Sequence, residues 1–193
     1  VELLSFHSTS KGFLGECGMR GGYVEAVGMH EGAKDELYKL FSISLCSNLP
    51  GQLMTELMVC PPKQGEESFP LYHEETSSIL GSLQRRSAKL ATALDGMEGV
   101  SCNPAHGAMY VFPRIHLTAS ALAKAAEMEL TPDSYYCEQL LNETGICVVP
   151  GSGFGQADGT WHFRTTFLPA EDKMDKVIEV FSEFQRKWVA EHP

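Results

Sequence analysis

The sequence predicts an α/β fold, because strand-like and helix-like segments alternate along most of its 193 residues. Two segments predict this most directly. In residues 70–94 apolar side chains recur at steps of three and four, which is typical of one long amphipathic helix. In residues 161–167 apolar and polar side chains alternate, which is typical of a strand with one buried face. A hydrophobic content of 43% is enough for a sizeable core, in one large domain or in parts of two.

The first third of the chain predicts two strands and two helices. A short buried strand is expected at 1–6 and a second strand at 21–27. Helices are expected at 35–45 and 52–59, with Asn48-Leu49-Pro50 ending the first of them. The Pro- and Gly-containing segment 60–65 then predicts a domain boundary. We therefore expect residues 1–65 and 66–193 to belong to different domains, the second entered by the long helix.

The remainder alternates between strands and helices. Strands are expected at 100–103 and 108–112, around a turn at 104–107, and at 146–149. A helix is expected at 120–130, and the final amphipathic helix at 170–191. Between them, Thr131-Pro132-Asp133 is typical of a helix start with a hydroxyl cap, and Gly145 is typical of a helix end.

Composition excludes several classes of function. A net charge of −10 and a pI near 5.1 argue against a nucleic-acid partner. No apolar stretch reaches bilayer length, and the histidines lack the spacing of a metal site. The six scattered cysteines favour reduced thiols. The chain starts without methionine inside a predicted strand, so we expect it to be the C-terminal part of a longer polypeptide.

Lys11 is the first candidate for chemistry. It follows Ser8, Thr9 and Ser10 at the end of a predicted strand, and it is either a solvated loop lysine or a lysine that bonds an aldehyde. The second interpretation is favoured by the hydroxyls and by Arg20, which can bind a phosphate together with Ser8 and Ser10. An amine attacks an aldehyde only when deprotonated, which burial and a nearby cation favour. Pyridoxal phosphate is the cofactor that needs both an amine and phosphate donors.

Arg164 is the second candidate. It lies on the polar face of the predicted strand 161–167, beside His162 and Thr166. It is either a surface arginine or a ligand for a substrate carboxylate. The glycine-rich segment 150–155 lacks the Lys-Ser/Thr of a P-loop, so a structural turn is the better interpretation.

The order of these motifs resembles that of class I and II aminotransferases. The matching strings are Ser8-Thr9-Ser10-Lys11 with Gly18-Met19-Arg20-Gly21-Gly22, 107–113, 149–155 and 163–169, and they extend over essentially the whole chain. The fuller strings 5–12, 15–18 and 145–150 resemble the alanine-specific branch of this family.

The resemblance implies the C-terminal part of a fold-type I enzyme that uses pyridoxal 5′-phosphate and is active as a homodimer. Lys11 would bond the cofactor and move a proton at the substrate Cα, Ser8 and Arg20 would hold the cofactor phosphate with Ser10 as a further donor, and Arg164 would bind the substrate α-carboxylate. The implied partners are a small amino acid and a 2-oxo acid, and the implied reaction converts L-alanine and 2-oxoglutarate to pyruvate and L-glutamate. A cytoplasmic and a mitochondrial compartment both stay open as expectations.

Two departures qualify the resemblance. Arg20 follows Lys11 by nine residues, where many members of the family have eight. The family's N-terminal half, which supplies further cofactor contacts, has no counterpart in this chain. Two alternatives therefore stay open: a related small-amino-acid transaminase, such as a glutamate–glyoxylate enzyme, or a truncated half-protein without catalysis.

Overall fold

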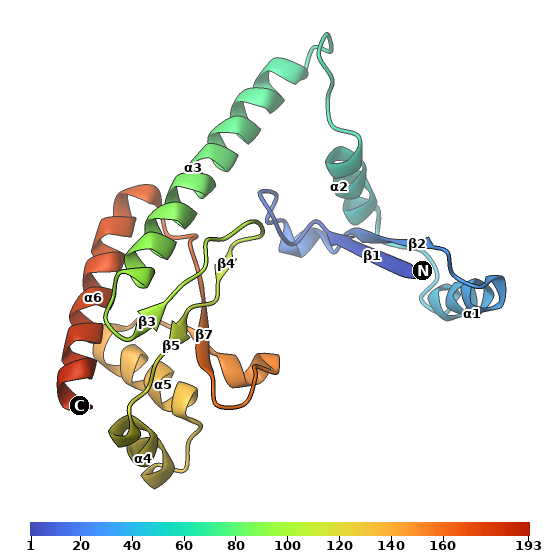
Figure 1. Cartoon of the computed structure of the whole chain (residues 1–193). Helices are drawn as coiled ribbons and strands as arrows, with labels where there is room; N and C mark the ends of the chain where they lie inside the picture. Colours follow the sequence, from blue (N-terminus) through green and yellow to red (C-terminus); the bar gives the residue numbers. More distant parts are fainter. The chain divides into compact units, whose positions relative to one another are not determined.

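The computed structural model describes every residue, Val1–Pro193, and Figure 1 shows its helices and strands. The chain divides into two compact units, Val1–Ile79 and Leu80–Pro193, and each is described by itself. Helix α3 (Phe69–Asp95) contains the division, and it confirms the single long helix that the 70–94 pattern predicts. The domain boundary near residue 65 stays a prediction.

The first unit is built on a two-stranded antiparallel hairpin. Strand β1 (Leu3–Ser8) pairs with β2 (Gly22–Val27) in a register that sets Leu3 opposite Val27 and Ser8 opposite Gly22. A short 3-10 turn (Cys17–Met19) lies in the connection, and helix α1 (Glu31–Ser42) follows the hairpin. The expectation of a buried first strand is wrong, because β1 has no buried residue and lies in a sheet of only two strands.

Helix α2 (Leu49–Val59) begins where the sequence predicts a stop. Asn48 is its N-cap, since the Asn48 side chain accepts a hydrogen bond from the Gly51 N–H at 2.8 Å. Pro50 stands in the first turn, where its missing N–H costs nothing. Asn48-Leu49-Pro50 therefore starts α2 and does not end the preceding helix, because α1 has already ended at Ser42.

The second unit contains a five-stranded antiparallel sheet. Its order is β3 (Val100–Ser101), β5 (Arg114–Ile115), β7 (Trp161–Thr166) and β4 (Tyr110–Val111), with β6 (Val149–Pro150) also paired to β7. The two strands predicted around residues 104–107 do not pair with each other: β3 pairs with β5, and β4 pairs with β7. Because β7 pairs with three strands, it is the strand that organises this unit.

Three helices complete the second unit: α4 (Ala119–Glu127), α5 (Pro132–Thr144) and α6 (Met174–Glu191). Helix α5 starts and ends as predicted, and Gly145 closes it with the left-handed backbone (φ 74°) that glycine tolerates best. The hydroxyl cap predicted at Thr131 does not form. Its hydroxyl donates instead to the Ser134 hydroxyl at 2.6 Å. Helix α6 starts four residues later than expected, after a 3-10 turn (Glu171–Lys173).

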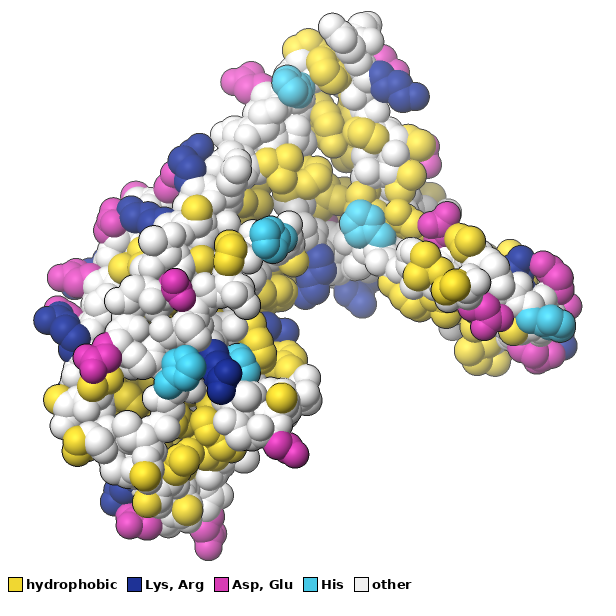
Figure 2. Space-filling model, viewed as in Figure 1, with side chains coloured by type: hydrophobic (Ala, Val, Ile, Leu, Met, Phe, Trp, Pro, Cys, Tyr) yellow, Lys and Arg dark blue, Asp and Glu magenta, His cyan; other side chains and the backbone are white.

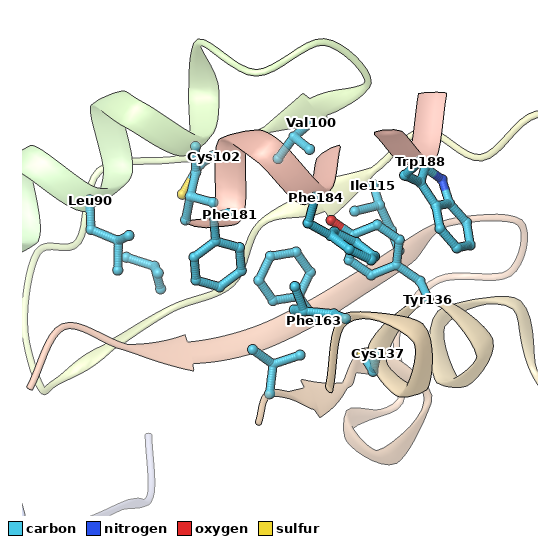
Figure 3. Close-up of a cluster of buried hydrophobic side chains, with 14 of the residues drawn as sticks. Leu90, Val100, Cys102, Ile115, Tyr136, Cys137, Phe163, Phe181, Phe184 and Trp188 are labelled. Atoms are coloured by element: carbon cyan, nitrogen blue, oxygen red, sulfur yellow. The ribbon is translucent and has the colours of Figure 1, made fainter. Parts of the chain in front are cut away.

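The hydrophobic core lies in the second unit. Phe163 on β7 is fully buried and stacks between Tyr136 of α5 and Phe181 of α6, as the close-up in Figure 3 shows. Trp188 closes the cluster against Tyr136, with ring centroids 4.9 Å apart. Every hydrophobic residue of the core lies between Leu90 and Trp188. The alternation predicted for 161–167 is confirmed, since Phe163, Thr165 and Phe167 are buried while the residues between them are partly exposed.

The first unit has an exposed apolar surface instead of a core. Hydrophobic side chains appear on the visible face over the β1–β2 hairpin and helices α1 and α2 (Figure 2). The large ones that are more than half exposed in these four elements are Leu3, Phe6, Tyr38, Leu40, Phe41, Leu49, Leu53 and Val59. A two-stranded hairpin is marginal in water without packing on one face, so we expect this unit to be the less stable part of the chain.

No helix of the structure is both long enough and apolar enough to span a bilayer.

Candidate active site

The loop that carries Lys11 is held by its neighbour Thr9. Thr9 is fully buried, and both its hydroxyl and its N–H donate to the Gly21 carbonyl at 3.1 Å. The Thr9 carbonyl accepts the Glu16 N–H at 2.9 Å. These bonds join the start of the β1–β2 connection to its middle, at Glu16, and to its end, at Gly21. Thr9 is therefore the structural member of the Ser-Thr-Ser-Lys string, and it fixes where Ser8 and Lys11 stand.

Ser8 and Lys11 line the same cavity, which has a volume of about 740 Å³. Phe6 and Tyr23 line it too, so the cavity has apolar and aromatic walls as well as an amine and a hydroxyl. Lys11 is exposed, and the burial that the sequence argument expects for it is not found. The exposed position leaves Lys11 accessible to a ligand entering the cavity.

Ser10 is placed differently from Ser8. Its N–H donates to the Ser8 hydroxyl oxygen at 3.1 Å, and its carbonyl accepts the Cys17 thiol at 3.4 Å. The Ser8 oxygen thus has a donor, which leaves the Ser8 hydroxyl proton available to an anion. Ser10 does not line the cavity, so its contribution to the loop is through its backbone.

Arg20 lies beside this cavity in an unusual backbone conformation. It ends the 3-10 turn with φ 53°, its Nη1 donates to the Cys17 carbonyl at 3.1 Å, and its own carbonyl accepts from the Asn48 side chain at 3.1 Å. It lines a second cavity of about 490 Å³, and the two cavities share Gly22, Tyr23 and Ser47 as lining residues. A guanidinium and an amine therefore flank the same short stretch of β2.

Arg164 lies in the second unit, on β7. Its guanidinium carbon is 4.5 Å from the centre of the Tyr110 ring and 4.6 Å from the centre of the Phe154 ring. Both distances are within the range of a cation–π interaction. Because a guanidinium stacked on rings keeps its N–H donors along its edge, this setting leaves a fork suited to a carboxylate.

Sequence reasoning missed the two aromatic partners of Arg164. Tyr110 reaches it because β4 pairs with β7, with Tyr110 opposite Thr166 in the register. Phe154 reaches it from the glycine-rich segment that the sequence predicts to be only a turn. Neither proximity has a signal in the local pattern, because both depend on strand pairing and loop placement.

The residues of the first unit fit pyridoxal phosphate. The cofactor presents an aldehyde and a phosphate dianion, and so requires an amine and anion donors. Lys11 and Ser8 supply an amine and a hydroxyl in one cavity, and Arg20 supplies a guanidinium in the adjoining one. Glu25 and Glu56 also line the Arg20 cavity, so the surroundings of this guanidinium are not uniformly positive. Arg164 belongs to the other unit and is set up for a carboxylate rather than for this group.

The fold is that of known aminotransferases. An alanine aminotransferase from Pyrococcus furiosus superposes with a TM-score of 0.75 at 23% identity, over 97% of this chain and 43% of the other. This likeness establishes the α/β aminotransferase fold.

The family follows from the sequence match. The family model described as aminotransferase class I and II matches residues 1–181, and the chain belongs to that family. It is 54% identical over 189 residues to a probable mitochondrial alanine aminotransferase of Dictyostelium discoideum, covering 98% of this chain and 35% of that protein. It is 47% identical to alanine aminotransferase 1 of Homo sapiens, covering 99% of this chain and 38% of that protein. The chain thus spans little more than a third of the length of these relatives.

Proposed function

We propose that this chain forms part of an alanine aminotransferase, which converts L-alanine and 2-oxoglutarate to pyruvate and L-glutamate. The observation that carries the proposal is the 54% identity to the Dictyostelium discoideum protein over nearly the whole chain. The cavity that joins Lys11 to Ser8, and the aromatic clamp around Arg164, support it with side chains of the required chemistry.

Lys11 has the central role in the proposed reaction. Bound pyridoxal phosphate supplies an electron sink that weakens the bonds at the substrate Cα. Lys11 is the residue that would hold the cofactor aldehyde through its amine, and its free amine would serve as the base for the proton at the substrate Cα. Its exposure on the rim of the cavity suits a side chain that must leave one partner and reach another atom.

The other residues hold charged groups. Ser8 and Arg20 bind the cofactor phosphate, and Ser10 supports the Ser8 hydroxyl through its N–H. Arg164 binds the α-carboxylate of the amino acid or oxo acid and so fixes which bond at Cα is presented for reaction. We further propose a homodimer, in a mitochondrial or cytoplasmic compartment.

The first test is cofactor trapping. The protein is mixed with pyridoxal phosphate, reduced with borohydride and mapped by peptide mass spectrometry. We expect label on Lys11, and loss of that label in Lys11→Ala. The control is Lys39→Ala, because Lys39 is an exposed lysine paired with Glu36 on α1. Label spread equally over surface lysines would contradict the assignment of Lys11.

Donor preference tests the reaction. The full enzyme is assayed with L-alanine, glycine and L-aspartate as donors and with 2-oxoglutarate or glyoxylate as acceptor. We expect the highest kcat/KM with alanine and 2-oxoglutarate. A preference for glyoxylate would favour the glutamate–glyoxylate alternative, and a strong preference for aspartate would exclude the alanine assignment.

A further inference from the structure

Asp133 is a buried carboxylate that the proposed reaction does not use. It stands in the first turn of α5 and is fully buried. Its Oδ2 accepts the Ser152 N–H at 2.5 Å and the Gln156 side-chain amide at 3.0 Å. Its Oδ1 accepts the Ser134 N–H at 3.1 Å. One carboxylate therefore holds both ends of the segment 152–156, and Phe154 lies at its centre.

The charge of Asp133 makes this anchor strong. Burial by itself raises the pKa of the Asp133 carboxyl, but its hydrogen bonds, those from Ser152 and Gln156 among them, outweigh burial and keep the pKa below its ordinary value. Asp133 is therefore ionised at neutral pH. Hydrogen bonds to an ionised acceptor are roughly twice as strong as those between neutral groups.

A second set of contacts supports the same loop from β7. The Gln156 side-chain oxygen is 3.0 Å from Nδ1 of His162. The His162 ring stacks almost parallel on Phe112, with centroids 4.8 Å apart. Phe112 in turn meets Phe154 edge to face, with centroids 5.8 Å apart. These contacts fix the direction of the Phe154 ring as well as the path of its backbone.

The Phe154 ring would not be held by core packing alone. Its side chain is 44% exposed, and it is not part of the buried cluster. Its position over the Arg164 guanidinium thus depends on the loop. Tyr110 lies on β4 and packs partly against the core, so it is the fixed side of the clamp and Phe154 is the adjustable side.

We infer that Asp133 and Phe154 are positioning residues for Arg164: Asp133 anchors the glycine-rich loop, and the loop closes Phe154 over the guanidinium that binds substrate carboxylate. The inference rests on the proposed function for the identity of the carboxylate, but the clamp itself can be measured without any reaction.

The direct test is an NMR measurement on the full chain labelled with ¹⁵N-arginine. The chain has six arginines, and the Arg164 Nε–H signal is identified by its loss in Arg164→Lys. Two rings beside the guanidinium predict a ring-current shift that the exposed arginines lack. We expect Phe154→Leu and Asp133→Asn to move this signal toward the range of the exposed arginines.

The matched control is Gln185→Met. Gln185 is also buried in this unit, where it accepts from the Tyr136 hydroxyl at 2.8 Å and donates to the Glu98 carbonyl at 2.7 Å. Its replacement removes buried hydrogen bonds that involve neither the loop 152–156 nor Arg164, so we expect it to lower stability without moving the Arg164 signal. An equal movement in Gln185→Met would overturn the inference.

Kinetics give a second readout in the holoenzyme. We expect Phe154→Leu and Asp133→Asn to raise KM for L-alanine and for 2-oxoglutarate by the same factor, about two- to fivefold for loss of one cation–π partner. Destabilisation alone lowers the concentration of active enzyme, and so lowers the apparent kcat while KM stays constant. Asp133→Glu, which keeps the charge, should recover part of the lost affinity.

The outcomes separate the two proposals. An unchanged Arg164 signal and unchanged KM values in Phe154→Leu overturn the positioning role. Phe154→Leu tests the positioning role even if Asp133→Asn fails to fold, because the Phe154 side chain lies largely outside the core. A wild-type enzyme that has no transaminase activity but shows the shifted Arg164 signal overturns the proposed function and supports the clamp.

Discussion

Phe163→Ala tests whether β7 carries the core of the second unit. Phe163 is fully buried, and its ring stacks on Tyr136 at 5.7 Å and on Phe181 at 6.1 Å between centroids. Replacing a buried phenylalanine by alanine costs about 3–5 kcal/mol, from lost transfer free energy and from the cavity left behind. A unit of this size shifts its melting temperature by roughly 4 °C per kcal/mol, so we expect a decrease of about 12–20 °C.

The assay is thermal unfolding followed by far-UV circular dichroism and by tryptophan fluorescence. Trp188 packs on Tyr136 in the same cluster, so its emission reports on the loss of the core. The control is Phe112→Ala, the same substitution on a side chain that is 41% exposed, for which we expect about half the loss or less. If Phe163→Ala lowers the melting temperature no more than Phe112→Ala, the assignment of β7 as the central strand is wrong.

Three further predictions follow from burial and charge. In hydrogen exchange, amides of β1 and β2 should exchange much faster than those of β7, since the hairpin has no core behind it; equal protection would contradict this description. Burial raises the pKa of the Cys102 thiol to about 11 and that of the Cys137 thiol to about 12, so both should react slowly with Ellman's reagent at pH 8; fast reaction of all six thiols would refute their burial. The fast thiols should be Cys17, Cys46, Cys60 and Cys147. The pKa of Asp133 is lower in the folded chain than its unfolded value of about 3.9, so its stabilisation is complete above that pH and is lost as the pH falls toward the folded pKa. Asp133→Asn should flatten this acid-induced loss of stability, and an unchanged acid profile would argue against an ionised Asp133.

Some elements were predictable because local pattern and tertiary packing agree. The alternation of Phe163, Thr165 and Phe167 predicts β7 correctly, since one face of that strand packs on the core. Pro132 and Gly145 predict both ends of α5, because backbone geometry at these positions depends on the residue itself. The side chains proposed for the site could also be chosen from the sequence, because the chemistry of an amine, a hydroxyl or a guanidinium group follows from the residue type alone.

Other features have no signal in a linear pattern. Strand β5 has only two residues, Arg114 and Ile115, which is too short for any period to show. The apolar run at the start of the chain predicts a strand, but nothing in the run tells whether another segment covers it. Asp133 is typical of a helix start, and only the folded chain shows that its carboxylate holds a loop nineteen residues away. Burial and long-range hydrogen bonds are therefore the features that the sequence alone does not predict.

The capping of α2 has a chemical consequence for the Arg20 loop. Asn48 uses both ends of one amide: its oxygen accepts the Gly51 N–H, while its nitrogen donates to the Arg20 carbonyl. Aspartate has the same shape and caps a helix equally well, yet it has no proton to offer Arg20. Deamidation of Asn48 would therefore preserve the helix cap. It would also place a carboxylate oxygen next to the Arg20 carbonyl oxygen, so that a hydrogen bond is replaced by repulsion between two oxygens. A change of one mass unit would release the backbone of Arg20, the arginine that we propose to bind the cofactor phosphate.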